Sequence, residues 1–266
     1  MNDSYKAKTI KELKAFARGQ LIGKYGVAIL AILVVSCIYY TATMIEASVV
    51  GDNTSGYVTG LVIDVVINLL FGIFAYGQNA FFLKVARGDK TASPADLFSG
   101  LKDVTDKTIL IQAVFAAFSF LGIIPSVLLH FKLIIVPDKY YAFFSYGVIA
   151  LQNLLYFLAS LYFGLSFYIL ADDKEANAAD ILKRSFKLMK GKKGRLLAIY
   201  LSSIPLLLIS FCACGIGYFW FGVFFETLLA DFYLDTIGEE PFDPRTVKEN
   251  ITQDPSDGSS TLDIHL

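Results

Sequence analysis

Six long runs of apolar residues dominate this chain of 266 residues and restrict what it can fold into. A helix that crosses a bilayer needs about 20 mostly apolar residues, and each run approaches or exceeds that length. Charged residues make up only 18% of the chain, against about 25% in an average soluble domain. The sequence therefore predicts an all-α integral membrane bundle of six transmembrane helices. The six segments cover residues 25–45, 57–83, 108–129, 144–170, 196–212 and 217–234.

Lys and Arg are distributed unequally between the loops that join these segments. Of the 23 Lys and Arg residues, 21 fall in the N-terminal arm, in the loops at 84–107 and 171–195, and in the tail. Cytoplasmic loops of membrane proteins carry such an excess of basic residues. We therefore expect residues 1–238 to form the membrane domain, with both termini in the cytoplasm. The acidic tail at 239–266 is expected to be disordered.

Three short motifs at an 84-residue spacing precede the three pairs of segments. In each, a Thr, Ser or Asn is followed three residues later by an acid and then by an apolar residue, a pattern typical of a helix start. We therefore expect three hairpin repeats, at about 8–85, 92–170 and 176–234. Each repeat would begin with an amphipathic helix lying on the cytoplasmic membrane surface. The motifs are Thr9-x-x-Glu12-Leu13, Ser93-x-x-Asp96-Leu97 and Asn177-x-x-Asp180-Ile181.

The third of these short helices is strongly basic. Residues 181–195 contain seven Lys or Arg and no acid, and anionic lipid headgroups attract such clusters. One interpretation is lipid-specific or regulatory binding. Ordinary anchoring by cytoplasmic basic residues explains the same pattern and is favoured. The candidate headgroup contacts are Lys183, Arg184, Lys187, Lys190, Lys192, Lys193 and Arg195.

Polar side chains inside the apolar runs form a second candidate site, because ionisable groups are costly in a bilayer. Asp64 lies well inside the second segment, and Glu226 lies inside the sixth. Spacings of three and four residues place Asp64 on a helix face with other polar and small residues, turned toward neighbouring helices. The pattern fits a core that binds an ion, proton or small solute, and it equally fits interhelical hydrogen bonding. The candidate residues are Asp64, Asn68, Asn79, Gln152 and Glu226.

The sequence contains no motif of a familiar enzyme class. Its two histidines, His130 and His265, are far apart, and there is no zinc-binding His pair at ligand spacing. Nucleophile elbows, phosphate-binding loops and dinucleotide fingerprints are also missing. Basic residues are interleaved with apolar ones that suit lipid, which argues against a nucleic-acid partner. We therefore expect no catalytic residues, no metal site and no cofactor.

Five stretches carry a family resemblance: residues 77–90 (GQNAFFLKVARGDK), 96–98 (DLF), 185–191 (SFKLMKG), 214–217 (CGIG) and the pair Phe232-Tyr233. Together they resemble an uncharacterised bacterial membrane family, known as domain of unknown function 975. The likeness extends over most of residues 10–234. It implies a multi-pass protein of the bacterial plasma membrane with no assigned activity, so it transfers no site residues.

These features support three hypotheses about function. The leading one is a non-enzymatic membrane scaffold or accessory protein that contacts anionic lipids or a membrane-protein partner. The first alternative is a small-solute or ion transporter that uses the intramembrane carboxylates. The second is a membrane-embedded enzyme acting on lipid, with Asp64 and Glu226 as acid and base. A water-filled cavity joining these two residues would favour either alternative, and a dry, closely packed interior would favour the scaffold.

Overall fold

The computed structural model describes residues 7–50, 53–102, 104–212 and 216–244, and within these ranges every regular element is a helix. The all-α expectation is therefore confirmed. Residues 245–266 of the predicted disordered tail, and most of the turn before the last segment, lie outside the described residues. The helices are α1 (Ile10–Gln20), α2 (Tyr25–Val49), α3 (Thr54–Ala86), η1 (Pro94–Leu101), α4 (Thr105–His130), α5 (Asp138–Phe163), α6 (Ser166–Asp172), α7 (Ala178–Met189), α8 (Lys193–Cys212) and α9 (Ile216–Ile237).

Five helical segments of the described chain are long and apolar enough to cross a membrane, judged by length and composition alone. The prediction of six such segments therefore holds for five. Helix α9 falls outside this set, and it carries three acidic residues, Glu226, Asp231 and Asp235, that lower its hydropathy. The five segments are Tyr25–Val49, Thr54–Ala86, Thr105–His130, Lys139–Asp172 and Lys193–Cys212.

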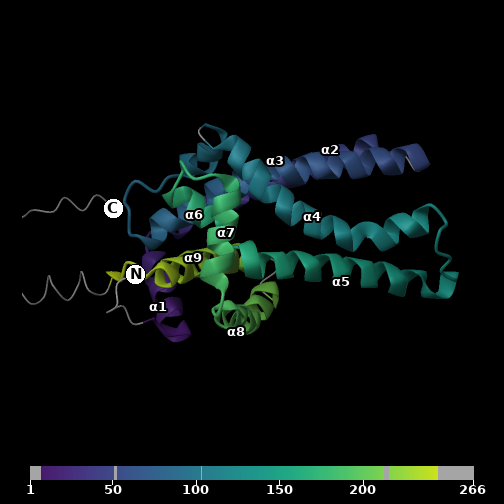
Figure 1. Ribbon diagram of the computed structural model, residues 1–266. Coiled ribbons are helices and arrows are strands. Elements are labelled where there is room, and N and C mark those ends of the chain that lie inside the picture. The colour runs from purple at the N-terminus through teal and green to yellow at the C-terminus, as the bar shows by residue number, and fades with distance from the viewer. Residues whose placement is uncertain (1–6, 51–52, 103, 213–215, 245–266) are drawn as a thin grey trace, which may run out of the picture.

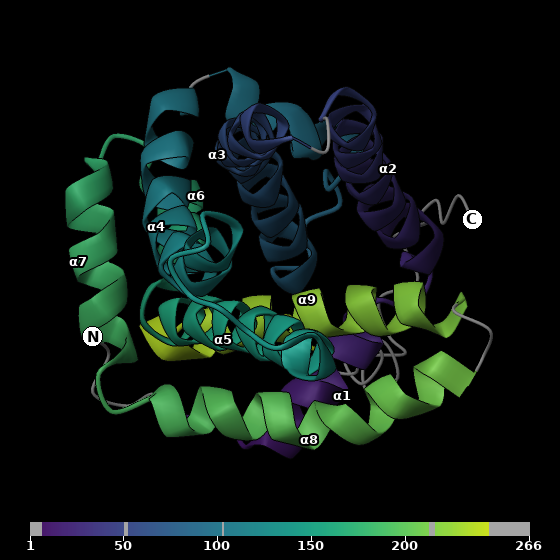
Figure 2. The ribbon, with the colours of Figure 1, turned by 90° about the vertical axis from the view of Figure 1, so that its right-hand side faces the viewer.

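The helices run in two main directions. Helices α2, α3, α4 and α5 extend together toward one end of the molecule, and α1, α6 and the last turns of α9 lie at the other end (Figure 1). Figure 2 views those long helices nearly end-on and shows α8 and α9 lengthwise, so the last pair lies crosswise to the others. The expected third hairpin, parallel to the first two, is not what the structure has. Contacts of α9 with α1, α2 and α3 as well as α8 hold it in this position.

The three predicted helix starts are all present, with two differences in detail. Thr9 and Glu12 form a reciprocal capping box at the start of α1. Ser93 and Asp96 form another, but the element that follows is a 3₁₀ helix, η1. Asn177 precedes α7 without a side-chain capping bond. The cap motifs thus locate the helix starts correctly, and the expectation of a side-chain cap at Asn177 is corrected.

At least one apolar residue of each short helix packs inside the protein. Leu13, Leu97 and Ile181, which follow the three acids at equal spacing, are each completely buried. They belong to one hydrophobic core that also includes the C-terminal parts of α3, α6 and α9. We call this region, where α1, η1, α6 and α7 meet α3 and α9, the base of the bundle. The spacing in the sequence thus locates three residues that contact protein rather than lipid.

A repeated aromatic triplet fills the base. Near the C-terminus of α3, of α6 and of α9, a Phe is followed by Phe or Tyr and then by Leu or Ile. All nine side chains are buried, and the rings of Tyr168 and Tyr233 stack with centroids 5.3 Å apart. The sequence-based expectations do not include this pattern, although it is readable once the three helix ends are aligned. The triplets are Phe81-Phe82-Leu83, Phe167-Tyr168-Ile169 and Phe232-Tyr233-Leu234.

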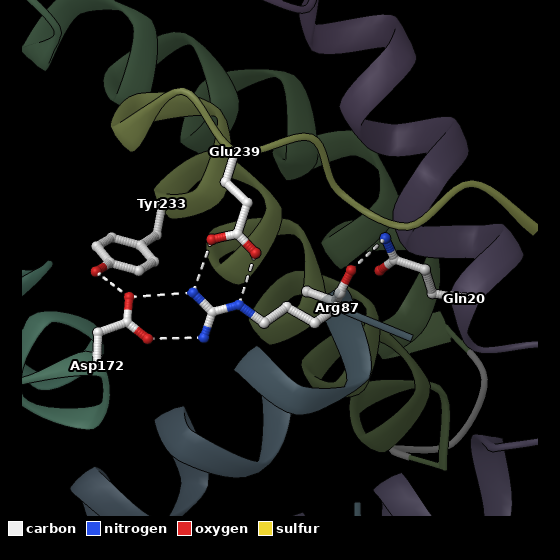
Figure 3. A network of polar contacts seen from close by, with 6 residues as sticks. Gln20, Arg87, Asp172, Tyr233 and Glu239 are labelled. Atoms are coloured by element: carbon white, nitrogen blue, oxygen red, sulfur yellow. Dashed lines mark hydrogen bonds and ion pairs between the residues drawn. The ribbon is translucent and has the colours of Figure 1, made fainter. Parts of the chain in front are cut away.

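An ion-pair network joins the ends of these helices (Figure 3). Arg87, which follows α3, donates from Nε and Nη2 to the two carboxylate oxygens of Glu239, at 2.8 Å each. It also donates from Nη1 and Nη2 to Asp172 at the end of α6, at 2.7 and 3.1 Å. The hydroxyl group of Tyr233 donates to the same Asp172 carboxylate at 2.7 Å. Hydrogen bonding to Glu239, and next to Asp172, raises the pKa of Arg87 above its ordinary value.

Gln20 connects α1 to the same region. Its Nε2 atom lies 2.9 Å from Asp231 Oδ1, 2.9 Å from the Phe242 carbonyl oxygen and 3.3 Å from that of Ala86. Figure 3 shows Gln20 near Arg87, on a helix separate from those that lead to Arg87 and carry Tyr233. One buried amide group therefore holds α1, the end of α3 and the segment after α9 together.

Close backbone contact between α3 and η1 depends on Gly77. A Cβ atom added at Gly77 would lie 2.0 Å from the carbonyl oxygen of Leu97, which no real structure tolerates. We therefore expect Gly77→Ala to destabilise the protein by about 1–3 kcal/mol, the usual cost of overpacking. The melting temperature in detergent, followed by far-UV circular dichroism, measures the effect.

Gly147 provides the matched control for this substitution. It lies within α5, and nothing lies within 4 Å of a Cβ atom added there. Gly147→Ala should leave stability unchanged or raise it by up to about 1 kcal/mol, because alanine favours helix. Equal melting temperatures for the two variants would contradict the close packing of α3 on η1.

The Arg87 network gives a second stability prediction. Arg87→Gln leaves two carboxylates without their cation and should lower stability by about 1–2 kcal/mol, less than for a fully buried pair because these side chains are partly exposed. Arg184→Gln is the control, since Arg184 donates to Asp173, next to Asp172, from a more exposed position. Thermal melts should show a clear loss for Arg87→Gln and almost none for Arg184→Gln. A similar loss in both variants would argue against a special role for Arg87.

Candidate functional site

A polar cavity lies between α3, α4 and α5 and reaches α8 and α9. It consists of two parts, of about 490 and about 340 Å³. The two parts adjoin, because the same four side chains line both. The shared residues are Phe71, Gln112, Asn153 and Tyr156.

Asp64 and Asn68 of α3 line the smaller part of the polar cavity, opposite Gln152 of α5. The Nδ2 atom of Asn68 donates to Asp64 Oδ1 at 3.0 Å. Gln152 Nε2 donates to the hydroxyl group of Ser119 on α4, also at 3.0 Å. A further hollow of about 270 Å³ adjoins Asp64 and is lined by a second acid, Glu46. This end of the cavity is therefore rich in carboxylate and amide groups.

Glu226 of α9 lies in the larger part, with Gln78 and Asn79 of α3. Gln78 is hydrogen-bonded to the Glu226 side chain. Asn79 donates from Nδ2 to the carbonyl oxygen of Ala75, one turn earlier, at 2.7 Å. Tyr200 of α8 completes this wall.

All five predicted polar-core residues therefore line one of the two adjoining parts of the polar cavity. Asp64, Asn68 and Gln152 lie in the smaller part, and Asn79 and Glu226 lie in the larger part. The sequence reasoning did not identify five other polar residues of the lining. Each is a polar or phenolic side chain within an apolar run, which is the signal that could have found them. These residues are Tyr39, Gln78, Ser119, Asn153 and Tyr200.

A glycine sets the spacing of the helices at the Gln152 side. A Cβ atom added at Gly122 of α4 would lie 2.5 Å from the Cα atom of Gln152. The backbones of α4 and α5 therefore touch at this level, which holds Gln152 beside Ser119. Small residues at such contacts are the usual means by which membrane helices approach each other.

The polar cavity is lined by acidic side chains but not by basic ones. Its lining contains carboxylate groups together with amide and hydroxyl groups, which both donate and accept hydrogen bonds, and no Lys or Arg is among the described residues that line either part. Buried carboxylates need a partner that offsets the cost of their burial. Among the described residues, no group of three or more His, Cys, Asp or Glu side chains could hold a metal ion. A monovalent cation or a protonated amine fits this lining better than an anion.

The seven predicted headgroup contacts divide into two groups. Lys183, Arg184 and Lys187 of α7, and Lys190 directly after it, are exposed, and the Arg184 guanidinium lowers the pKa of Asp173 by hydrogen bonding to its carboxylate.

The other three basic residues have partners inside the protein. Arg195 forms an ion pair with the buried carboxylate of Asp235. Lys192 donates to the Thr236 carbonyl oxygen at 2.7 Å. The Lys193 ammonium group lies 3.3 Å from the ring centroid of Tyr162.

The fold and the polar cavity define the class of this chain: a helical protein with several apolar helices, which suggest that it is embedded in a membrane. Residues 1–239 match the family model described as "Protein of unknown function (DUF975)", so the chain belongs to that family. No curated protein and no solved structure matches the chain. The resemblance inferred from residues 10–234 is therefore confirmed, and the family assigns no activity.

Proposed function

We propose that this protein is a non-enzymatic transporter that binds a small cationic solute in the polar cavity and carries it across the plasma membrane of a bacterium. The observation that carries the proposal is the pair of adjoining hollows between the helices, one lined by Asp64 and the other by Glu226, with four side chains that line both. Carboxylates within membrane helices are expensive, so a polar hollow around them indicates a ligand path more than simple packing.

The scaffold hypothesis gains less support. A scaffold would have a closely packed interior throughout. The base of the bundle is closely packed, but the region between the long helices is hollow. One surface supports a second candidate function, which is contact with lipid headgroups or with another protein. Lys183 and Lys187 of α7, and Lys190 directly after it, are exposed beside the half-exposed ring of Phe186, a combination that suits anionic headgroups or an acidic partner.

Uptake into proteoliposomes tests the transport proposal. The probes are radiolabelled methylammonium, choline, Na⁺ and K⁺, with mannitol as the neutral comparison. We expect uptake of at least one cationic probe, reduced about tenfold or more by Asp64→Asn and by Glu226→Gln, because each removes a charge-assisted contact.

Asp106→Asn and Glu175→Gln are the matched controls, since both acids are exposed and neither lines the polar cavity. These variants should transport like the wild type. Normal uptake by the Asp64 and Glu226 variants would refute the assigned site. Absence of uptake for every probe would refute the transport proposal, and the scaffold would again be the leading hypothesis.

The crosswise α8 and α9 also change the expected topology. We propose that α2, α3, α4 and α5 cross the membrane and that α8 and α9 form a hairpin entered from the cytoplasmic side. Four crossings keep both termini in the cytoplasm, as six would, and they satisfy the same distribution of basic residues. The short helices α1 and α7 would then lie at the cytoplasmic surface, packed on the bundle.

Cys212, at the end of α8 and exposed, distinguishes the two topologies. In a Cys37→Ser, Cys214→Ser background, a membrane-impermeant maleimide added to intact cells should leave Cys212 unlabelled until the cells are permeabilised. Asn53→Cys in the same background, with Cys212→Ser, should be labelled from outside. Labelling of Cys212 in intact cells would favour six crossings and rule out the cytoplasmic hairpin.

A further inference from the structure

A second hollow lies on the other side of α9 from the polar cavity. It has a volume of about 460 Å³, and α1, the start of α2, α8 and α9 line it. Figure 2 shows α8 and α9 side by side, with α1 behind them. We call this hollow the α8–α9 groove, and its two ends differ in chemistry.

One end of the α8–α9 groove is cationic. Lys14 and Arg18 are one helical turn apart on α1, and Lys14 Nζ donates to the carbonyl oxygen of Ser202 at 2.7 Å. Within the described part of the chain, no carboxylate lies within ion-pair distance of either side chain. Burial, and next the charge of Arg18, lower the pKa of Lys14. The pair therefore offers two positive charges to a ligand.

The rest of the groove is apolar. Its walls are Leu206 and Ile209 of α8, both exposed, and the aromatic rings of α9 that face them. From Ser202 to Ile209 the wall extends about 10 Å along α8, since an α-helix rises about 1.5 Å per residue. Trp220 lines this apolar part of the groove, and its ring stacks on that of Tyr25 at a centroid distance of 5.3 Å.

The geometry points to an anionic phospholipid as the occupant of the α8–α9 groove. We propose that its phosphate binds Lys14 and Arg18 and that part of one acyl chain lies between α8 and α9 along Leu206 and Ile209. Phosphate oxygens accept charge-assisted hydrogen bonds from Lys and Arg, and the chain covers apolar surface that is otherwise exposed. The cationic end of the groove matches the phosphate, and the apolar walls match the acyl chain. The groove therefore fits a lipid better than a free anion. This site is separate from the polar cavity, so the inference does not rest on transport.

The chain contains one tryptophan, and Trp220 lines this groove, so all tryptophan fluorescence comes from a residue at its wall. The experiment adds phosphatidylglycerol with brominated acyl chains, which quench tryptophan on contact, to the full-length protein in detergent micelles. Brominated phosphatidylcholine is the neutral comparison. Each cation near an anionic headgroup should contribute about a fivefold gain in affinity, so the midpoint of quenching should favour phosphatidylglycerol by about thirtyfold.

The double variant Lys14→Gln, Arg18→Gln should lose this preference, with quenching by the two lipids becoming alike. Lys90→Gln, Lys102→Gln removes two exposed cations that do not line the groove and should keep the wild-type preference. Arg18→Gln alone, an exposed position, should retain the fold and lower the preference about fivefold if the double variant is unstable. A large excess of inorganic phosphate should not displace the brominated lipid.

Three results would overturn the inference. The first is equal quenching of the wild-type protein by the two brominated lipids. The second is a preference that survives in Lys14→Gln, Arg18→Gln. The third is displacement of the lipid by inorganic phosphate, which would identify a free-anion site.

Discussion

The Arg87 guanidinium fixes where distant parts of this chain meet. One edge of the guanidinium group donates hydrogen bonds to Glu239, after α9, and the other edge donates to Asp172, at the end of α6. A partly buried arginine without these partners would be costly, and so would two unpaired carboxylates beside it. The ends of α3, α6 and α9 therefore have to converge, and their aromatic triplets fill the space around that point. The close packing of the base follows from this convergence.

The base and the long helices are held together by different interactions. At the base, apolar side chains from six or more elements bury one another, and Phe82, Leu97 and Phe232 lose all contact with solvent. Between the long helices no such force acts if lipid surrounds them, because lipid tails are as apolar as the side chains. Glycine contacts and polar pairs then set the spacing, as Gly122 and Gln152 do. A bundle held firmly at one end can therefore keep a polar cavity between its helices.

Local patterns in the sequence predicted local structure well. The cap motifs located three helix starts, and the spacing around Asp64 gathered residues that do share one cavity. Two features could not be predicted because they depend on distant partners. The apolar face of α1 meets protein, and periodicity cannot specify what covers a face. Arg195 turns inward because Asp235, 40 residues later, is buried beside it. The residues around Arg195 in the sequence give no indication of this ion pair.

The position of α9 links the two proposed sites. Glu226 follows Phe224 by two residues, a rotation of about 200° on a helix with 3.6 residues per turn. One face of α9 therefore presents Glu226 to the polar cavity, and the opposite face presents Phe224 to the α8–α9 groove. The carboxylate-lined cavity and the cationic groove therefore lie on opposite faces of a single helix, although their proposed ligands have opposite charge.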